Sequence, residues 1–514
     1  MEAEFAASMA NGGDVRRKRG LITFSVMLGS FLQSLDLTIA NVALPHIQGT
    51  VSATPEQISW VLTSYIVAAA ITIPLSGWLA DRYGRKKILV ASAAGFTLAS
   101  ALCGASNSLS QIVAFRLLQG VCGAALVPQA QAVLLDINPP ARQGRAMAIW
   151  IMTLTVAPAL GPVLGGWLTD NYSWRWVFYV NVPIGILSVL GMLASIRESE
   201  RRSSSFDFLG FASLSVAVAA FQVMLDRGQT QDWFNSTEIC LEAAVTALAF
   251  YLFIVHTLTA THAPFVRPIL FRDRNFTVGT ILIFLLGIVM FAGLSLLPPL
   301  LQDLLGYPVT LAGSATAPRG LGSFVGTLVI ARLVSRVDAR LLMGLGLLLT
   351  AGSLWQMCQF SPQMDDQLVM LSGFLNGFGI ACAYVPLATV CFATLPAQFR
   401  SEGTSIFNLL RNIGSSVGIS AVQALLTRNS QIAHASLGEH VSAYGVHFYA
   451  ATPLRMATPR DIATLNATVT RQAEWIAYLD DFKLLLVLTL ACLPLVALLR
   501  RAPRTGDKPT LAVE

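Results

Sequence analysis

Long apolar segments recur along nearly the whole chain, and they restrict its fold more than any other feature. A helix needs about 20 apolar residues to cross a hydrocarbon core roughly 30 Å thick. Fourteen segments of about that length lie near 20–44, 57–80, 88–106, 111–135, 146–169, 177–196, 208–225, 240–258, 276–300, 312–334, 341–358, 368–394, 404–427 and 484–500. Only 12% of the 514 residues are charged, about half the share of a soluble domain. The sequence therefore predicts an all-α polytopic membrane protein and excludes a soluble multidomain enzyme.

The positions of the basic residues predict the orientation of these spans. If the N-terminus lies inside, most of the 34 Lys and Arg residues fall in inside loops and tails, as the positive-inside rule requires. An even number of spans then places both termini in the cytoplasm. The net charge of +6 is thus explained by topology, and we expect the chain to contact lipid and no nucleic acid. Arg116, Arg319 and Arg411 alone remain at membrane depth.

The inside loop between spans two and three carries a dense motif, which runs from Gly77 to Lys87 and reads GWLADRYGRKK. Glycine permits a tight, closely packed turn, and a plain basic loop is the alternative explanation. The motif resembles the signature loop of the major facilitator superfamily, in which Gly77, Asp81, Arg82, Gly84 and Arg85 would control conformational change. A weaker copy lies between spans ten and eleven, where Leu333, Ser335, Arg336 and Arg340 align with Leu79, Asp81, Arg82 and Lys86. Parallel repeats are expected of that superfamily.

Span five contains a second motif, whose key positions are Pro158, Gly161, Pro162, Gly165 and Gly166. Small residues let helices approach closely, and proline weakens the helical hydrogen bonding. A simple packing surface is one explanation. The order of these residues also resembles the antiporter motif of drug exporters in the same superfamily, which favours export over uptake.

A carboxylate and an arginine are predicted at membrane depth in the N-terminal half. Asp36 lies about 16 residues along span one, or roughly 24 Å at 1.5 Å per residue. Arg116 lies about six residues from the outer end of span four, so both fall in the outer half of the membrane. They could share one water-filled cavity and carry protons, because burial and a nearby cation shift a carboxyl pKa in opposite directions. Purely structural roles for both residues remain the alternative.

Further segments resemble the EmrB/QacA subfamily of fourteen-helix drug:proton antiporters, and its EmrB branch in particular. They are the stretches 35–45, 174–185, 225–234 and 477–482. The resemblance implies a major facilitator fold: a six-helix bundle at 1–200, two linker helices at 201–265 and a second bundle at 266–514. It also implies a bacterial inner-membrane pump that works with a periplasmic membrane-fusion adaptor and an outer-membrane channel. The polar segment 428–483, with a helical pattern at 461–480, is the expected adaptor contact.

The expected substrates follow from the charges at membrane depth. We assign the substrate cavity to Asn41, Gln119, Arg319, Asn408 and Arg411. Three buried arginines against one carboxylate favour lipophilic anions, weak acids or neutral drugs over organic cations. An exporter of an endogenous metabolite or siderophore remains an alternative, and a nutrient transporter or an intramembrane enzyme is disfavoured.

The energy source is inferred from what the sequence lacks. No GxxxxGK[ST] phosphate-binding loop occurs in it, so ATP hydrolysis by this chain is not expected. We expect the proton motive force to drive transport, with no cofactor. The histidines of the outside segment, at 434, 440 and 447, have no metal-ligand spacing, and we expect no metal.

Overall fold

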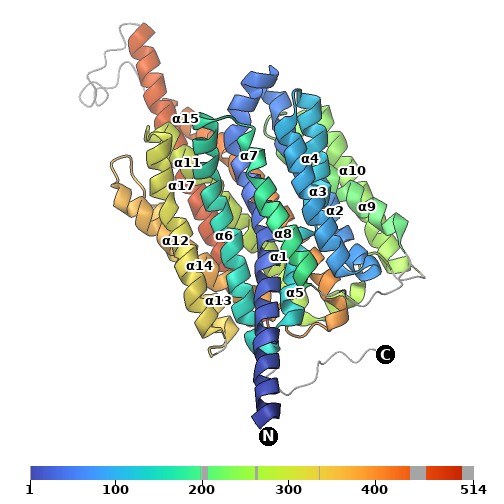
Figure 1. Cartoon of the computed structure of the whole chain (residues 1–514). Coiled ribbons are helices and arrows are strands. Elements are labelled where there is room, and N and C mark those ends of the chain that lie inside the picture. The colour runs from blue at the N-terminus through green and yellow to red at the C-terminus, as the bar shows by residue number, and fades with distance from the viewer. Residues whose placement is uncertain are drawn as a thin grey trace.

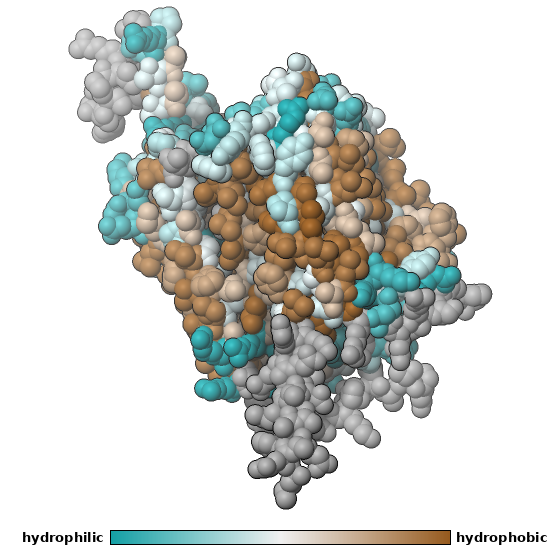
Figure 2. Space-filling model, viewed as in Figure 1, coloured by the Kyte–Doolittle hydropathy of each residue, from teal (hydrophilic) through white to brown (hydrophobic). Residues whose placement is uncertain are grey.

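The computed structural model of the chain describes residues 2–196, 198, 206–260, 264–334, 336–439 and 459–500, with side chains from residue 19 onward apart from isolated positions such as Pro162. These residues form helices joined by short connections, and no strand occurs among them. The long helices run side by side in one bundle (Figure 1). On the face seen in Figure 2, hydrophobic residues form a band across the middle of the bundle and hydrophilic ones gather toward both ends, a distribution that suits contact with lipid.

Each predicted span coincides with a helix or a pair of consecutive helices. In the first half these are α1 (Glu2–Val51), α2 (Pro55–Tyr83), α3 (Arg85–Ala105), α4 (Leu109–Gly123) with α5 (Leu126–Ile137), α6 (Pro140–Asn171), and α7 (Trp176–Tyr179) with α8 (Asn181–Ser195). Then follow α9 (Phe208–Arg227), α10 (Thr237–Thr259), α11 (Arg274–Pro299) with the π-helical turn η3 (Leu300–Leu304), α12 (Val309–Leu333), α13 (Ala339–Met357), α14 (Asp366–Val390), α15 (Arg400–Glu439) and α17 (Pro459–Ala497). Short 3-10 turns cover Trp233–Asn235, Pro268–Arg272 and Ala397–Phe399.

Ten helical segments among the described residues are long and apolar enough to cross a membrane. The other four predicted spans coincide with helices α12, α13, α15 and α17. Below, "inner end" means the end of the bundle that carries the loops predicted to lie inside, and "outer end" means the opposite one.

The described parts of the outer segment 428–483, residues 428–439 and 459–483, are helical. Helix α15 continues past its span to Glu439, and α17 begins at Pro459, well before the last span. The helix expected at 461–480 is therefore present as the first half of α17, not as a separate element. His434 Nε2 lies 3.1 Å from Asn466 Oδ1 and joins the two extensions. Residues 440–458, including His440 and His447, lie outside the described residues.

The two helices expected as a linker pack at one side of the bundle, where α9 lies next to α2 and α15. Leu214 and Val218 of α9 share an apolar cluster with Ile73 of α2 and Leu409 of α15. The Ser420 hydroxyl of α15 donates to the Leu225 carbonyl at 2.7 Å. Helix α9 thus contacts elements from both predicted six-helix bundles, while the boundaries proposed at 200 and 265 stay a prediction.

Candidate functional site

Asp36 of α1 and Arg116 of α4 form an ion pair in the interior of the helix bundle. Arg116 Nη1 lies 2.5 Å from Asp36 Oδ2, and both side chains are 0% exposed. Removing two charges from water costs several kcal/mol per ion, so such a pair persists only with good geometry and further hydrogen bonds. The sequence suggested a shared water-filled cavity, whereas the structure joins the two side chains directly and encloses them.

The remaining polar atoms of the pair bond to neighbouring helices. Asp36 Oδ1 accepts from Gln119 Nε2 and from Asn181 Nδ2, both at 3.0 Å. Arg116 donates through Nε to the Val61 carbonyl at 3.0 Å and through Nη1 to Gln119 Oε1 at 2.9 Å. Helices α1, α2, α4 and α8 therefore meet in one buried polar network.

Aromatic rings and small residues complete the enclosure. The Arg116 guanidinium lies 4.7 Å from the ring centroid of Tyr65 and 5.6 Å from that of Phe178, which is within the range of cation–π attraction. Gly120 lets α4 approach α2 closely, because a Cβ there would collide with the Tyr65 carbonyl. Arg116 Nη2 is buried without a hydrogen-bond partner among the described residues, so the guanidinium keeps one donor unused.

The signature loop lies at the inner end, where the two halves of the chain meet. Gly77 faces α15, and a Cβ there would lie 3.1 Å from the Glu402 Cα. Gly84 has φ +95° between α2 and α3, a backbone region that side chains disfavour. Close packing against α15 therefore favours glycine at position 77, and the backbone conformation favours glycine at position 84. Asp81 and Arg82 lie between them, on the last turn of α2.

Asp136, at the end of α5, links the two halves of the chain. Its carboxylate pairs with Arg85 of α3 and, at 2.8 Å, with Arg400 of α15. Arg85 Nε also donates to the Ser401 hydroxyl at 2.9 Å. Deeper in, Asn408 Nδ2 donates to Gln131 Oε1 at 2.8 Å. These contacts hold α15 against α3 and α5, so the inner end is closed on this side.

Glu402 is a buried acid at the same interface. Its Oε1 accepts from the Arg267 backbone N–H at 2.8 Å, and its side chain is 15% exposed. Burial raises the pKa of Glu402 to about 7; Arg267 opposes that shift and Asp81 adds to it. The carboxyl group therefore titrates near neutral pH.

The span-five motif lies on α6, which runs unbroken from Pro140 to Asn171. Gly161 faces α1, and a Cβ there would collide with the Thr38 hydroxyl. Gly166 has open space, with no atom within 4 Å of such a Cβ. Gly165 is buried and Pro158 half-buried.

The five residues assigned to a substrate cavity do not form one cluster. Gln119 belongs to the Asp36 network, Asn408 to the contact between the halves, and Asn41 is exposed on α1. Arg319 Nη2 donates to the Met290 carbonyl at 2.8 Å, and Arg411 Nη1 to the Tyr384 hydroxyl at 3.0 Å. Neither of these two guanidinium groups pairs with a carboxylate among the described residues.

Sequence reasoning missed four residues that the structure places in these networks: Asn181, Asp136, Arg400 and Glu402. Asn181 is the only strongly polar residue between Trp176 and Ile186, and that isolation was a usable signal. Asp136 and Glu402 look like ordinary loop acids, because their partners lie far away in the sequence.

Comparisons with known proteins agree with this architecture. The sequence profile of the Major Facilitator Superfamily matches residues 26–419. The chain is 38% identical over 460 residues to the multidrug export protein EmrB of Escherichia coli K12, covering 89% of this chain and 88% of that protein. It is 37% identical over 491 residues to the fatty acid resistance protein FarB of Neisseria gonorrhoeae, covering 94% and 97%. The crystal structure of the human organic anion transporter MFSD10 superposes with a TM-score of 0.60 at 15% identity, covering 92% of this chain and 99% of that one.

Proposed function

The chain belongs to the EmrB branch of the major facilitator superfamily, and we propose that it is a proton-coupled exporter of lipophilic toxic compounds. Its family makes it a multi-pass membrane transporter and not an enzyme. The observation that carries the proposal is the buried Asp36–Arg116 pair, because a proton carrier needs a carboxyl group that can exchange its charge for a proton.

In this proposal, protonation of Asp36 breaks its ion pair with Arg116. In the paired state the charge of Asp36 is balanced by Arg116 at 2.5 Å. A proton on Asp36 removes that charge and leaves a buried guanidinium without its counter-ion, which is costly in a low dielectric. Protonation therefore favours a rearrangement of α1 against α4. One proton moving down 100 mV supplies about 2.3 kcal/mol, enough for a concentration ratio of roughly 50.

The contacts that close the inner end suggest how the bundle changes between its closed and inward-open states during transport. Asp136 bonds to residues from both halves of the chain, so release of these contacts would open the bundle toward the inside. We propose that proton release and drug uptake accompany the inward-open state, and that drug release accompanies the state seen here. In this proposal, closure of the inner end is controlled by the signature-loop residues Gly77, Asp81, Arg82, Gly84 and Arg85. The span-five motif lets α6 change its packing as the inner end opens and closes.

The favoured substrates are lipophilic anions and neutral compounds. Arg319 and Arg411 lie at membrane depth without a carboxylate partner among the described residues, which favours anions. The names of two relatives, a multidrug exporter and a fatty acid resistance protein, support the same classes of compound.

We also propose an inner-membrane location with both termini in the cytoplasm, and a periplasmic adaptor that docks on the helical extensions of α15 and α17. An outer-membrane channel would complete the export route. The extensions support this assembly because they continue both helices beyond their spans at the outer end.

Everted membrane vesicles test the proposed function. A panel of neutral lipophilic antibiotics, together with a permanently ionised alkyl sulfonate, is added after respiration has acidified the lumen. Weak acids are avoided because they carry protons through the bilayer themselves. Wild-type vesicles should lose part of the pH gradient when a substrate is added, and Asp36→Asn vesicles should not. The matched control is Asp303→Asn, which changes an exposed acid on η3. A normal response of Asp36→Asn would refute the proton assignment.

A further inference from the structure

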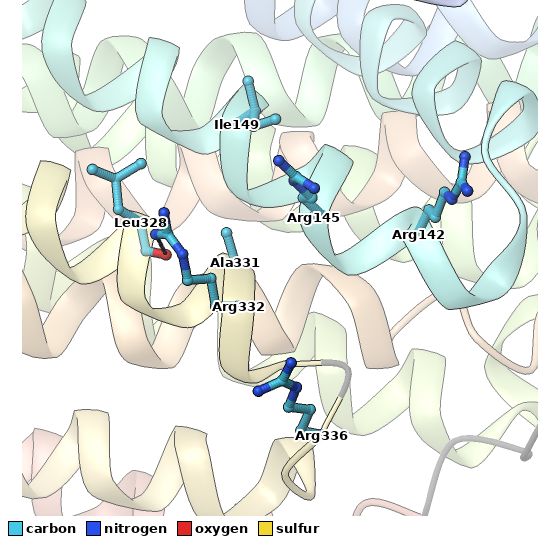
Figure 3. A pocket seen from close by; sticks show the side chains of 7 residues that line it. All are labelled: Arg142, Arg145, Ile149, Leu328, Ala331, Arg332 and Arg336. Carbon is cyan, nitrogen blue, oxygen red and sulfur yellow. Dashed lines mark hydrogen bonds between the residues drawn. The ribbon is translucent and has the colours of Figure 1, made fainter. Parts of the chain in front are cut away.

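A basic pocket lies at the inner end, between α6 and α12, away from the buried ion pair. Its volume is about 520 Å³, and its lining consists of Arg142, Arg145 and Ile149 from α6 with Leu328, Ala331, Arg332 and Arg336 from α12 and the turn after it (Figure 3). A second cavity of about 390 Å³ shares Arg142, Arg145 and Ile149.

The four arginines of this pocket have no acidic partner among the residues that the structure describes. The described residues that line the two cavities include no carboxylate, and none of the four arginines forms an ion pair within the described part of the chain. Arg332 Nη1 donates to the Leu328 carbonyl of its own helix, at 3.2 Å. Like charges on facing helices repel one another, so the pocket as it stands works against closure of the inner end.

The opposite side of the inner end is built differently. There the arginines that join α15 to α3, α5 and the 3-10 turn before α11 are balanced by Asp136 and Glu402. The internal repeat of the signature loop indicates that an acid is missing at the basic pocket. In the alignment of the two copies, Arg336 corresponds to Arg82, whereas Ser335 stands where the first copy has Asp81. The repeat has kept the cation and lost the acid.

The two helices are nevertheless held close together at this pocket. A Cβ on Gly144 would lie 2.5 Å from Val334 Cγ1, so α6 and α12 touch directly beside Arg145. Helix α6 begins at Pro140, and its N-terminus adds partial positive charge near Arg142. The closed state thus concentrates cations from both halves of the chain at one point.

The shape of the pocket points to an amphiphilic anion. All four arginines are exposed, whereas Ile149 and Leu328 lie one turn or more further along their helices, toward the apolar band. Arginine binds phosphate through a fork of parallel hydrogen bonds. A free anion would satisfy the arginines alone, whereas a phospholipid would also cover the apolar wall with its acyl chain.

We propose that this pocket binds the headgroup of an anionic phospholipid from the inner leaflet, and that the bound lipid stabilises the closed inner end. The phosphate takes the place of the acid that the internal repeat has lost. A ligand shifts an equilibrium only by its difference in affinity for the two states. That difference exists here because one headgroup can contact α6 and α12 together only while the two helices touch.

The test uses the full chain in nanodiscs of phosphatidylcholine, with or without phosphatidylglycerol. Native mass spectrometry counts the retained phosphatidylglycerol, and hydrogen–deuterium exchange follows the inner ends of α6 and α12. Phosphatidylglycerol should be retained by the wild type and should slow exchange at both helix ends. A basic side chain at an anionic surface contributes roughly fivefold in affinity. The variant Arg145→Gln/Arg332→Gln should therefore bind about 25-fold more weakly.

Matched variants keep the result interpretable. Arg272→Gln/Arg274→Gln removes the same charge from exposed positions at the inner end outside the pocket, and it should bind phosphatidylglycerol as the wild type does. Arg145→Lys/Arg332→Lys should retain most of the binding. Unchanged binding by the Gln double variant would overturn the proposed site. Equal protection by inorganic phosphate in phosphatidylcholine alone would overturn the assignment to a lipid.

Discussion

At the scale of single residues, Asp36 and Arg116 are two of the few charged residues at predicted membrane depth, and the bundle encloses them as a pair. Removing one member of a buried pair costs about 3–5 kcal/mol. We therefore expect Arg116→Gln to lower the thermal unfolding temperature of the detergent-purified protein. The double variant Asp36→Asn/Arg116→Gln should recover most of that loss, because Asn keeps hydrogen-bonding capacity toward Gln119 and Asn181. Equal unfolding temperatures for Arg116→Gln and the wild type would show that the pair contributes no stability.

Glu402 predicts a pH dependence of closure at the inner end. Its pKa is raised by burial from an ordinary value near 4.5 to about 7 in the closed state. Because the pKa of Glu402 is raised, the closed state holds the Glu402 proton more tightly than an open state would. The stabilisation of the closed state by this proton is complete below about pH 4.5 and is lost as the pH rises through 7. After correction for the intrinsic increase of amide exchange with pH, hydrogen exchange at the start of α15 should still increase between about pH 4.5 and 7. Glu402→Gln should remove the dependence, and a dependence that persists in this variant would assign it to another group.

The sequence made Asp36 and Arg116 conspicuous, because charged residues are rare in spans. It gave no comparable signal for Glu402 or Asp136, which lie among other polar residues near helix ends. Their importance depends on Arg267 and Arg400, distant residues that only the packing of the helices brings near.

At the scale of elements, the span-five motif separates into positions with and without a packing constraint. Gly161 is in close contact with Thr38 of α1, whereas Gly166 faces open space. We expect Gly161→Ala to push α6 from α1 and to reduce transport severalfold. Gly166→Ala, on the same helix, should transport nearly as the wild type does. Drug susceptibility of a pump-deficient strain that expresses each variant at equal level measures the difference, and equal activity of the two would remove the packing explanation.

Each predicted span coincides with described helix, and ten of these helical segments are apolar enough to cross a membrane, but hydrophobicity did not locate the ends of the helices. Apolar residues stop at the membrane surface, whereas α15 continues to Glu439 and α17 starts at Pro459 because helical hydrogen bonding does not require lipid. The helical spacing at 461–480 indicated this extension, and its continuity with the last span was not readable from hydropathy.

At the scale of the whole molecule, closure of the inner end depends on contacts between halves of the chain. Asp136→Asn removes the charge that holds Arg85 and Arg400 together, so we expect faster hydrogen exchange at the inner ends of α3 and α15. Glu238→Gln is the control, because it breaks an ion pair with Arg227 within the two helices expected as a linker. If the two variants exchange alike, the Asp136 contacts do not hold the inner end closed.

The general architecture of the molecule follows from composition and loop charge, but its conformational state does not. Basic residues in the loops indicate which end is inside, whatever the angle between the two halves. Among the described residues, acids pair with the arginines around Asp136 but not with those around Arg145, and this difference depends on how the two halves of the chain meet.

Transport by purified protein in proteoliposomes tests proton coupling through Asp36 most directly. A pH-sensitive dye inside the vesicles and a labelled substrate report proton and substrate movement together, and exchange of labelled for unlabelled substrate is measured at equal pH. For Asp36→Asn, we predict that substrate exchange persists while substrate-dependent proton movement disappears. Proton movement per substrate equal to that of the wild type would contradict the assignment of Asp36 as the proton carrier.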